Sequence, residues 1–165
     1  MTENVILIGM PGSGKSTAGV VLSKLLNYKF IDTDLLIQER ENARLSEIID
    51  RVGREGFHAI EEDVIASVEA RHAVIATGGS AIYHPRAMAH ARAIGTVVYI
   101  RISLEELSKR LGDLASRGVT FQPGQTLADL YAERIPLYEK YAHVTVDADG
   151  TDTSALAEAI AAALE

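Results

Sequence analysis

GMPGSGKS, at residues 9–16, matches the pattern GxxxxGK[ST] in full. The apolar run VILI at residues 5–8 comes directly before it and is typical of a short strand. After it, apolar residues recur at helical spacing, which predicts a helix that buries Ala18, Val21, Leu22, Leu25 and Leu26. A strand, a glycine-rich loop and a helix in this order are the context in which the pattern binds phosphate, so we expect a P-loop rather than a chance glycine turn.

The loop is suited to a nucleoside triphosphate. Its glycines leave the backbone amides open to phosphate oxygens, and the helix N-terminus adds a partial positive charge. Lys15 is expected to reach the β- and γ-phosphates, and the Ser16 hydroxyl is expected to ligate Mg²⁺. We therefore expect ATP and Mg²⁺, with nucleotide contacts from Gly12, Ser13, Gly14, Lys15, Ser16 and Thr17.

Composition narrows the class of protein. A chain of 165 residues is most simply one domain, here residues 1–165. Its net charge of −7 argues against general nucleic-acid binding, which requires a basic face. It contains no cysteine, which excludes disulfides and thiolate metal sites. The apolar runs are too short to span a membrane, and the N-terminus lacks a basic-then-apolar signal. We expect a monomeric, cytoplasmic protein without membrane or nucleic-acid partners.

Short apolar runs alternate with helical patterns along the whole chain. These runs are rich in β-branched residues and are continuous, as in strands covered on both faces. The alternation predicts an α/β fold, a five-stranded parallel sheet with helices on both faces. Ligands of such sheets bind beyond the carboxyl ends of the strands. The predicted strands are residues 5–8, 29–31, 73–76, 96–100 and 143–146.

Two carboxylates follow the second predicted strand. Asp32 is placed to hold Mg²⁺ through water, because Mg²⁺ keeps several of its water ligands. Asp34 is placed to accept the proton of an attacking hydroxyl. The alternative is that Asp34 only caps the helix that follows.

Thr77-Gly78-Gly79-Ser80 follows the third predicted strand. Glycines at this position let the backbone approach a ligand, although a plain turn explains them equally well. Arg110, Arg117 and Arg134 are candidates for balancing phosphate charge, against the alternative of solvated surface groups. Pro136, two residues after Arg134, is expected to kink or interrupt its helix.

Residues 112–125 are the least regular stretch of the chain. They form either a surface loop or a lid that closes over ATP to exclude water. Arg117 in its middle favours the lid.

In these motifs the chain resembles the shikimate kinase family, from the P-loop to beyond Tyr141. The resemblance implies a P-loop NTPase fold of the adenylate-kinase type, a three-layer sandwich with a helical substrate-binding insertion at about residues 34–70 and a lid at about 112–125. It is carried by GMPGSGKST at residues 9–17, Asp32-Thr33-Asp34, Phe57 with Glu61, Thr77-Gly78-Gly79, Arg110, Arg117 and Arg134-Ile135-Pro136-Leu137-Tyr138.

The resemblance also implies roles for individual residues. Asp34 would be the base, Arg117 the lid arginine, Arg134 the ligand of the substrate carboxylate, and Arg110 would stack near adenine. Motifs and resemblance together predict catalytic residues Lys15, Asp34 and Arg117, substrate-binding residues Asp34, His58, Gly78, Gly79 and Arg134, nucleotide-binding Arg110 and Arg117 beside the P-loop, and metal-binding Ser16 and Asp32.

The chain departs from the family pattern around the acceptor. His58 stands where the family has an arginine that grips the carboxylate of shikimate, Ser80 replaces a third glycine, and Gly118 replaces a proline after Arg117. Arg54, one helical turn before His58, could supply the lost guanidinium. Glu61 could raise the pKa of His58.

The predicted function is phosphorylation of an alcohol group on a small carboxylate-bearing metabolite. Shikimate is the first candidate acceptor, and homoserine or another small hydroxy acid is the alternative. A nucleoside monophosphate kinase and a non-catalytic NTP-binding switch rank lower. Asp34 and the Arg134 segment argue against a switch, which needs neither a base nor an acceptor pocket.

Overall fold

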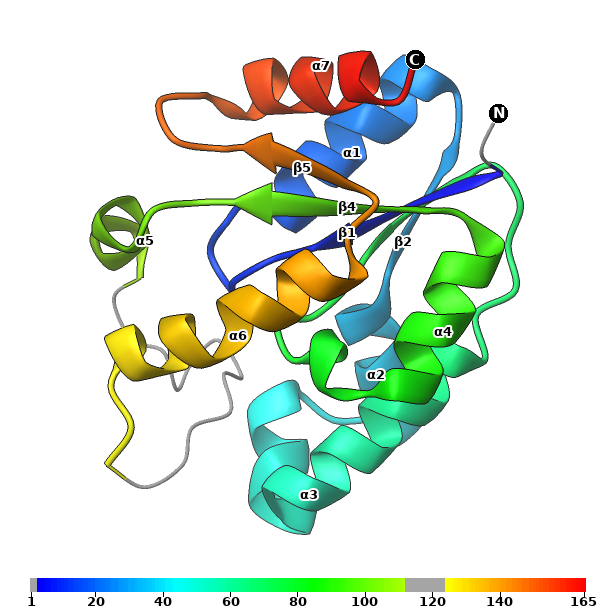
Figure 1. The fold of residues 1–165 in the computed structure, drawn as a ribbon. Helices are drawn as coiled ribbons and strands as arrows, with labels where there is room; N and C mark the ends of the chain where they lie inside the picture. Colours follow the sequence, from blue (N-terminus) through cyan, green and yellow to red (C-terminus); the bar gives the residue numbers. More distant parts are fainter. Residues whose placement is uncertain (1–2, 112–123) are drawn as a thin grey trace.

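The computed structural model describes residues 3–111 and 124–165. Arg117 and nearly all of the predicted lid therefore lie outside the described residues. Within them the chain forms three layers, a parallel sheet between two sets of helices (Figure 1).

The sheet has the predicted parallel arrangement. In the described residues its five strands run in the order β2-β3-β1-β4-β5, and every pair is parallel. The central strand β1 is buried along its whole length, which explains its continuous apolar sequence. The prediction of an α/β fold with a five-stranded parallel sheet is confirmed. The strands are β1 (Asn4–Ile8), β2 (Lys29–Asp32), β3 (Ala73–Ala76), β4 (Thr96–Arg101) and β5 (Val144–Asp147).

Helices cover both faces of this sheet. Figure 1 shows α1 and α7 packed together on one face, with α4 and α6 on the other. None of the helices in residues 3–111 and 124–165 is long and apolar enough to cross a membrane. The helices are α1 (Lys15–Leu26), α2 (Thr33–Glu41), α3 (Leu45–Ala66), the 3-10 turn η1 (Ala81–Tyr83), α4 (Pro85–Ile94), α5 (Leu104–Arg110), α6 (Leu127–Tyr141) and α7 (Thr153–Ala163).

The P-loop connects β1 to α1 through backbone conformations that favour glycine. Gly14, at the N-terminal end of α1, has φ of 99°, in the left-handed region. A Cβ on Gly9 would lie 2.7 Å from the carbonyl oxygen of Ile100, so the loop passes directly over the end of β4. Both glycines are therefore required for this path of the chain.

Two local sequence predictions on helices were wrong. Leu25 is 52% exposed, because the buried stripe of α1 follows Ala18 and Leu22, and Leu25 is rotated away from it near the helix end. Pro136 was expected to kink or interrupt its helix, and the interruption is not found, because α6 runs past it to Tyr141.

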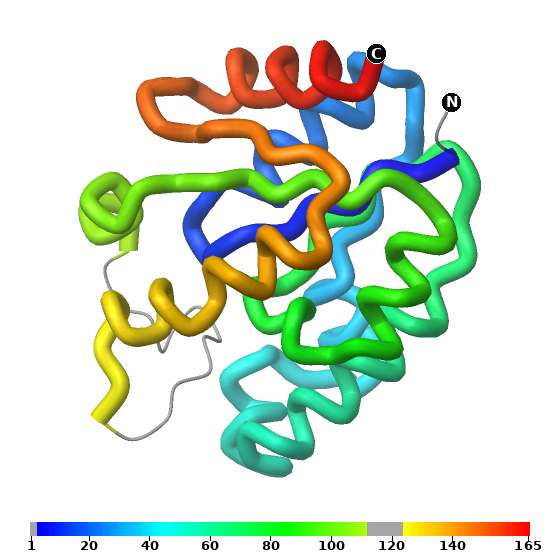
Figure 2. The backbone as a smooth tube through the Cα atoms, in the orientation of Figure 1, coloured from blue at the N-terminus to red at the C-terminus, as the bar shows by residue number. Residues whose placement is uncertain are grey.

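Helices α2 and α3 form a unit with a small core of its own, made by Ile37, Ile48, Phe57 and Val64. Figure 2 shows this helical pair at the opposite end of the molecule from α7. Gly53, with φ of 76° and ψ of 176°, divides α3 into two arms. The second arm carries Phe57 and Glu61 toward the carboxyl end of the sheet. The pair spans most of residues 34–70, whose role in substrate binding stays a prediction.

Candidate active site

A cleft of about 430 Å³ opens beyond the carboxyl ends of the strands, beside the P-loop. Its lining combines the P-loop with residues that follow β2 and β3 and with side chains from α3, α5 and α6. The described residues that line it are Pro11, Gly12, Gly14, Lys15, Ser16, Thr17, Asp34, Leu45, Phe57, Glu61, Thr77, Gly78, Gly79, Ser80, Arg110 and Arg134.

Most of the predicted site residues in the described chain meet in this one cleft. Among the described residues, the lining does not include Ser13, Asp32 or His58. Ser13 is buried within the loop, where its amide donates to the carbonyl of Met10 over 3.1 Å. Asp32 lies directly behind Ser16.

Lys15 lies over the P-loop with its amine held by backbone. The Nζ atom donates to the carbonyl oxygens of Gly9 and Met10, each over 2.8 Å. Burial lowers the pKa of Lys15 to about 8, and the nearby Asp34 opposes this shift. The amine is thus still mostly a cation at pH 7, in a place where a polyphosphate would meet it.

Ser16 and Asp32 form the candidate metal site. Ser16 Oγ donates to Asp32 Oδ2 over 3.0 Å. Asp32 Oδ1 accepts from the amides of Asp34 and Leu35, so Asp32 is the N-cap of α2. A hydroxyl and a carboxylate held side by side are hard oxygen donors, which fit Mg²⁺.

The alternative that Asp34 merely caps α2 is wrong, because Asp32 performs that role. Asp34 instead turns into the cleft. Burial, followed by the negative charges of Glu61 and Asp32, raises the pKa of Asp34 to about 7. A carboxyl group with this pKa is basic enough to take a proton near neutral pH.

Gly78 separates two carboxylates on the acceptor side of the cleft. A Cβ at this position would lie 2.8 Å from Asp34 Oδ1 and 2.8 Å from Glu61 Oε2. The glycine is therefore required by close approach, and not by a left-handed φ. The plain-turn alternative for residues 77–80 does not account for this crowding.

Arg134 reaches the cleft from α6 and is 1% exposed. Its Nε donates to the hydroxyl of Tyr83 over 3.2 Å, and the guanidinium lies over the Tyr83 ring. A Cβ on Gly79 would lie 2.9 Å from its Nη1. Tyr138, one turn along α6, donates to the carbonyl of Gly79 over 2.6 Å and so ties the helix to this loop. The surface-group alternative for Arg134 is wrong.

Arg110 lies on the nucleotide side of the cleft. It contacts Glu106 over 3.3 Å and the carbonyl of Gly12 over 3.4 Å. The position is compatible with the predicted place near adenine, which stays a prediction.

His58 is packed among aromatic rings. It stacks on Tyr83 at 5.7 Å between centroids and meets the edge of His84 at 5.2 Å. Burial lowers the pKa of His58 to about 4, and the opposing effect of Glu61 does not compensate. Glu61 does raise the pKa of His58 by its charge, as expected, but burial has the larger effect, so the ring is neutral at pH 7.

Arg54 does not line the cleft within the described residues, and its Nε is buried without a hydrogen-bond partner. Its predicted part as a replacement guanidinium has no contact in the structure to support it.

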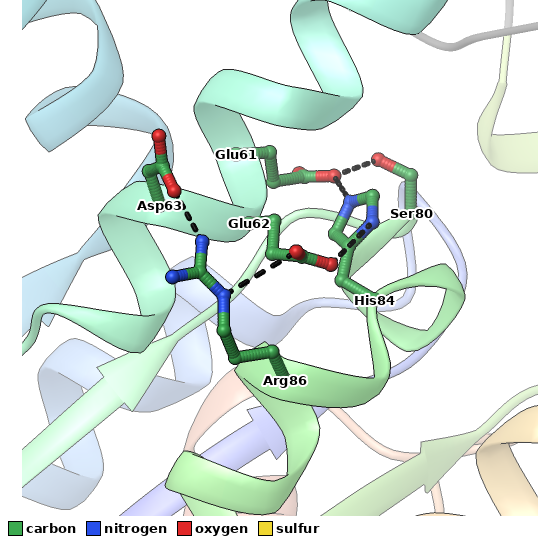
Figure 3. Close-up of polar contacts among 6 residues, drawn as sticks. All are labelled: Glu61, Glu62, Asp63, Ser80, His84 and Arg86. Atoms are coloured by element: carbon green, nitrogen blue, oxygen red, sulfur yellow. Dashed lines mark hydrogen bonds and ion pairs between the residues drawn. The ribbon is translucent and has the colours of Figure 1, made fainter.

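A buried polar cluster at the wall of the cleft was not predicted from the sequence (Figure 3). Glu61, which is 0% exposed, accepts at Oε1 from Ser80 Oγ over 2.5 Å and from His84 Nε2 over 2.8 Å. A signal for Glu61 was present, since it follows the buried Phe57 by four residues on one helix face. No local pattern connects it to His84, because 23 residues separate them.

Comparisons with known proteins agree with this geometry. A protein-family model described as shikimate kinase matches residues 11–165. The shikimate kinase of Nitrosospira multiformis is 35% identical over 163 residues, covering 97% of this chain and 84% of the relative. Shikimate kinase 2 of Yersinia enterocolitica is 36% identical over 153 residues, covering 90% of this chain and 88% of the relative. The structure of shikimate kinase from Acinetobacter baumannii in complex with shikimate aligns with a TM-score of 0.88 at 31% identity, covering 98% of this chain and 92% of that one.

Proposed function

The chain belongs to the shikimate kinase family, and on this basis we propose that it transfers the γ-phosphate of ATP to a hydroxyl of shikimate, giving shikimate 3-phosphate. One observation on this chain supports the proposal. The P-loop with Lys15, the carboxylate of Asp34 and the buried guanidinium of Arg134 line a single cleft.

The nucleotide side of the cleft supplies positive charge. The P-loop amides and Lys15 bind the β- and γ-phosphates of ATP. Ser16 and Asp32 would hold Mg²⁺, which when bound would neutralise charge on the phosphate oxygens. Arg110 would contact the nucleotide, and Arg117 in the lid would contact the phosphates that react.

The acceptor side supplies the base and the anchor. Arg134 binds the carboxylate of the acceptor through a charge-assisted hydrogen bond, and the Gly78 and Gly79 segment lies against its ring. The hydroxyl oxygen then attacks the γ-phosphorus, its proton passes to Asp34, and the bond to the β-phosphate oxygen breaks to release ADP. A base with a pKa of about 7 is half ionised at neutral pH, so no further activation is required.

His58 does not fit its predicted role as a direct ligand as well as the other residues do. Its ring is neutral and stacked on Tyr83, whose hydroxyl accepts from Arg134. We propose that it supports the carboxylate anchor through this aromatic contact. We also propose that the protein acts as a monomer, with residues 34–70 binding the acceptor and residues 112–125 forming the lid.

The test is an ATP-coupled assay with separate acceptors. We expect ADP release to depend on shikimate and the product to gain one phosphate. Homoserine, AMP and CMP should each give a kcat/KM at least about tenfold lower. Faster turnover of homoserine or of a nucleoside monophosphate would show that this molecule, and not shikimate, is the acceptor. A rate of ADP release that does not change with any acceptor would instead support the NTP-binding switch.

A further inference from the structure

We propose that His84 is a positioning residue of the acceptor site. His84 holds the carboxylate of Glu61 so that Oε2 of Glu61 stays beside Asp34. The inference rests on the proposed function, because it assigns a role in binding the acceptor of that reaction.

His84 is placed by the backbone around it. It precedes Pro85, which restricts it to an extended conformation, and its φ and ψ are −110° and 96°. It is the N-cap of α4, yet its side chain makes no cap hydrogen bond. At 4% exposure it instead crosses to α3 and contacts Glu61. The side chain at the N-cap of α4 therefore bonds to α3 and not to its own helix.

His84 and Ser80 occupy the same oxygen of Glu61. Both contacts fall on Oε1, while the buried Oε2 has no hydrogen-bond partner in the part of the chain that the structure describes. Oε2 lies against Gly78, as Asp34 Oδ1 does. Two donors on one oxygen fix the rotation of the carboxylate, so the other oxygen stays beside Asp34 and Gly78 at the wall of the cleft. A hydroxyl of the acceptor molecule that moves up to Asp34 is the chemical group that satisfies it.

Figure 3 shows Arg86 on the opposite side of this cluster from Ser80, which lines the cleft. His84 Nδ1 lies 3.9 Å from Glu62, too far for a hydrogen bond, and Glu62 in turn contacts the exposed Arg86 over 3.4 Å. Glu61 has no arginine or lysine in an ion pair among the described residues, so His84 and Ser80 are the groups that hold it.

The contact between His84 and Glu61 also affects Asp34, the proposed base. Oε2 of Glu61 and Oδ1 of Asp34 both lie 2.8 Å from the Cβ position of Gly78, so the two carboxylates are close neighbours. A Glu61 carboxylate that rotates or shifts would change both the hydrogen bond to the acceptor and the charge that Asp34 experiences. His84 therefore acts on the reaction through Glu61, without touching the acceptor itself.

The experiment compares His84→Asn with His84→Gln in the full chain. The Gln amide nitrogen can take the place of Nε2, whereas the Asn nitrogen falls at the place of Nδ1 and cannot reach Glu61. Asn is also a favourable N-cap residue, so α4 keeps its start. For His84→Asn we expect the KM for shikimate to rise at least about tenfold, while the KM for ATP stays within about twofold. For His84→Gln we expect recovery to within about threefold of the wild type.

A second pair of variants covers the case in which His84→Asn does not fold. Ser80→Ala removes the other donor on Oε1 and should also raise the KM for shikimate alone. Glu62→Gln changes charge on the outer side of His84 and should leave both KM values within about twofold. Equal kinetics for His84→Asn and His84→Gln, or no acceptor-specific effect of Ser80→Ala, would overturn the inference. A wild-type protein that does not phosphorylate shikimate would overturn the proposed function, and this inference with it.

Discussion

Gly78→Ala is the sharpest perturbation that the geometry allows, because a single methyl group would meet both carboxylates of the acceptor side. The added Cβ would lie 2.8 Å from an oxygen of Asp34 and 2.8 Å from an oxygen of Glu61. Carbon and oxygen atoms in ordinary contact are farther apart, so each oxygen must retreat by roughly half an ångström. Glu61 is held at Oε1 by two donors, which leaves Asp34 to take up more of the displacement.

A displaced base reduces the rate of the chemical step. A misplacement of about 1 Å costs on the order of 100-fold, so we expect kcat with shikimate to fall by roughly 10- to 100-fold. The KM for ATP should change little, because the three atoms nearest to the added methyl group belong to Asp34 and Glu61 and none belongs to the P-loop. Steady-state kinetics with shikimate and with ATP as the varied substrate measure the two effects separately.

Gly150→Ala is the matched control. Gly150 has φ of 71° and open space around its Cβ position, so alanine there adds backbone strain without a clash. We expect a lower melting temperature and an unchanged kcat. If Gly78→Ala keeps kcat within about twofold of the wild type, the spacing argument for the two carboxylates is refuted.

Three further predictions concern protons and metal. The kcat/KM for shikimate should rise as pH increases through about 7, where Asp34 ionises, and fall above about 8, where Lys15 loses its proton; a profile that is flat from pH 6 to 7.5 would contradict the assignment of the base. The pKa of Asp34 is higher in the folded protein than its ordinary value of 3.8, so its ionisation disfavours folding by an amount that grows from about pH 4 to 7 and remains above pH 7. Asp34→Asn should therefore raise the melting temperature more at pH 8 than at pH 4, while abolishing turnover; an equal shift at both pH values would show that the carboxyl is not perturbed. Ser16→Ala should raise the Mg²⁺ concentration needed for half-maximal rate by about tenfold or more, and an unchanged Mg²⁺ dependence would remove Ser16 from the metal site.

Much of the fold could be predicted because its signals are local. The β-branched runs identified all five strands to within about two residues, and the P-loop pattern identified the β1–α1 connection. Buried continuous strands also imply a parallel sheet, whose carboxyl edge collects the loops. The exposure of Leu25 could not be predicted in this way, since periodicity gives the face of a helix but not where its partner ends.

In the candidate site, too, local signals could be predicted and contacts between distant residues could not. The residues that line the cleft from the P-loop, from 77–79 and from α6 were found by motif and resemblance. The pKa values of Asp34 and His58 were not, because burial is their largest cause and burial depends on distant parts of the chain. The same holds for the link between Glu61 and His84, which only the packing of α4 on α3 creates.

The separate core of α2 and α3 has a consequence for how this protein can change. Ile37, Ile48, Phe57 and Val64 pack with one another and are not members of the main core. Ile65 at the end of α3 belongs to the main core, so the first arm of α3 is the part that can open without global unfolding, and its amides should exchange with deuterium sooner than those of β1. If this unit binds the acceptor as proposed, substitutions in it would alter which molecule is accepted and spare the nucleotide side of the cleft, so the acceptor specificity of the enzyme can evolve with little loss of stability.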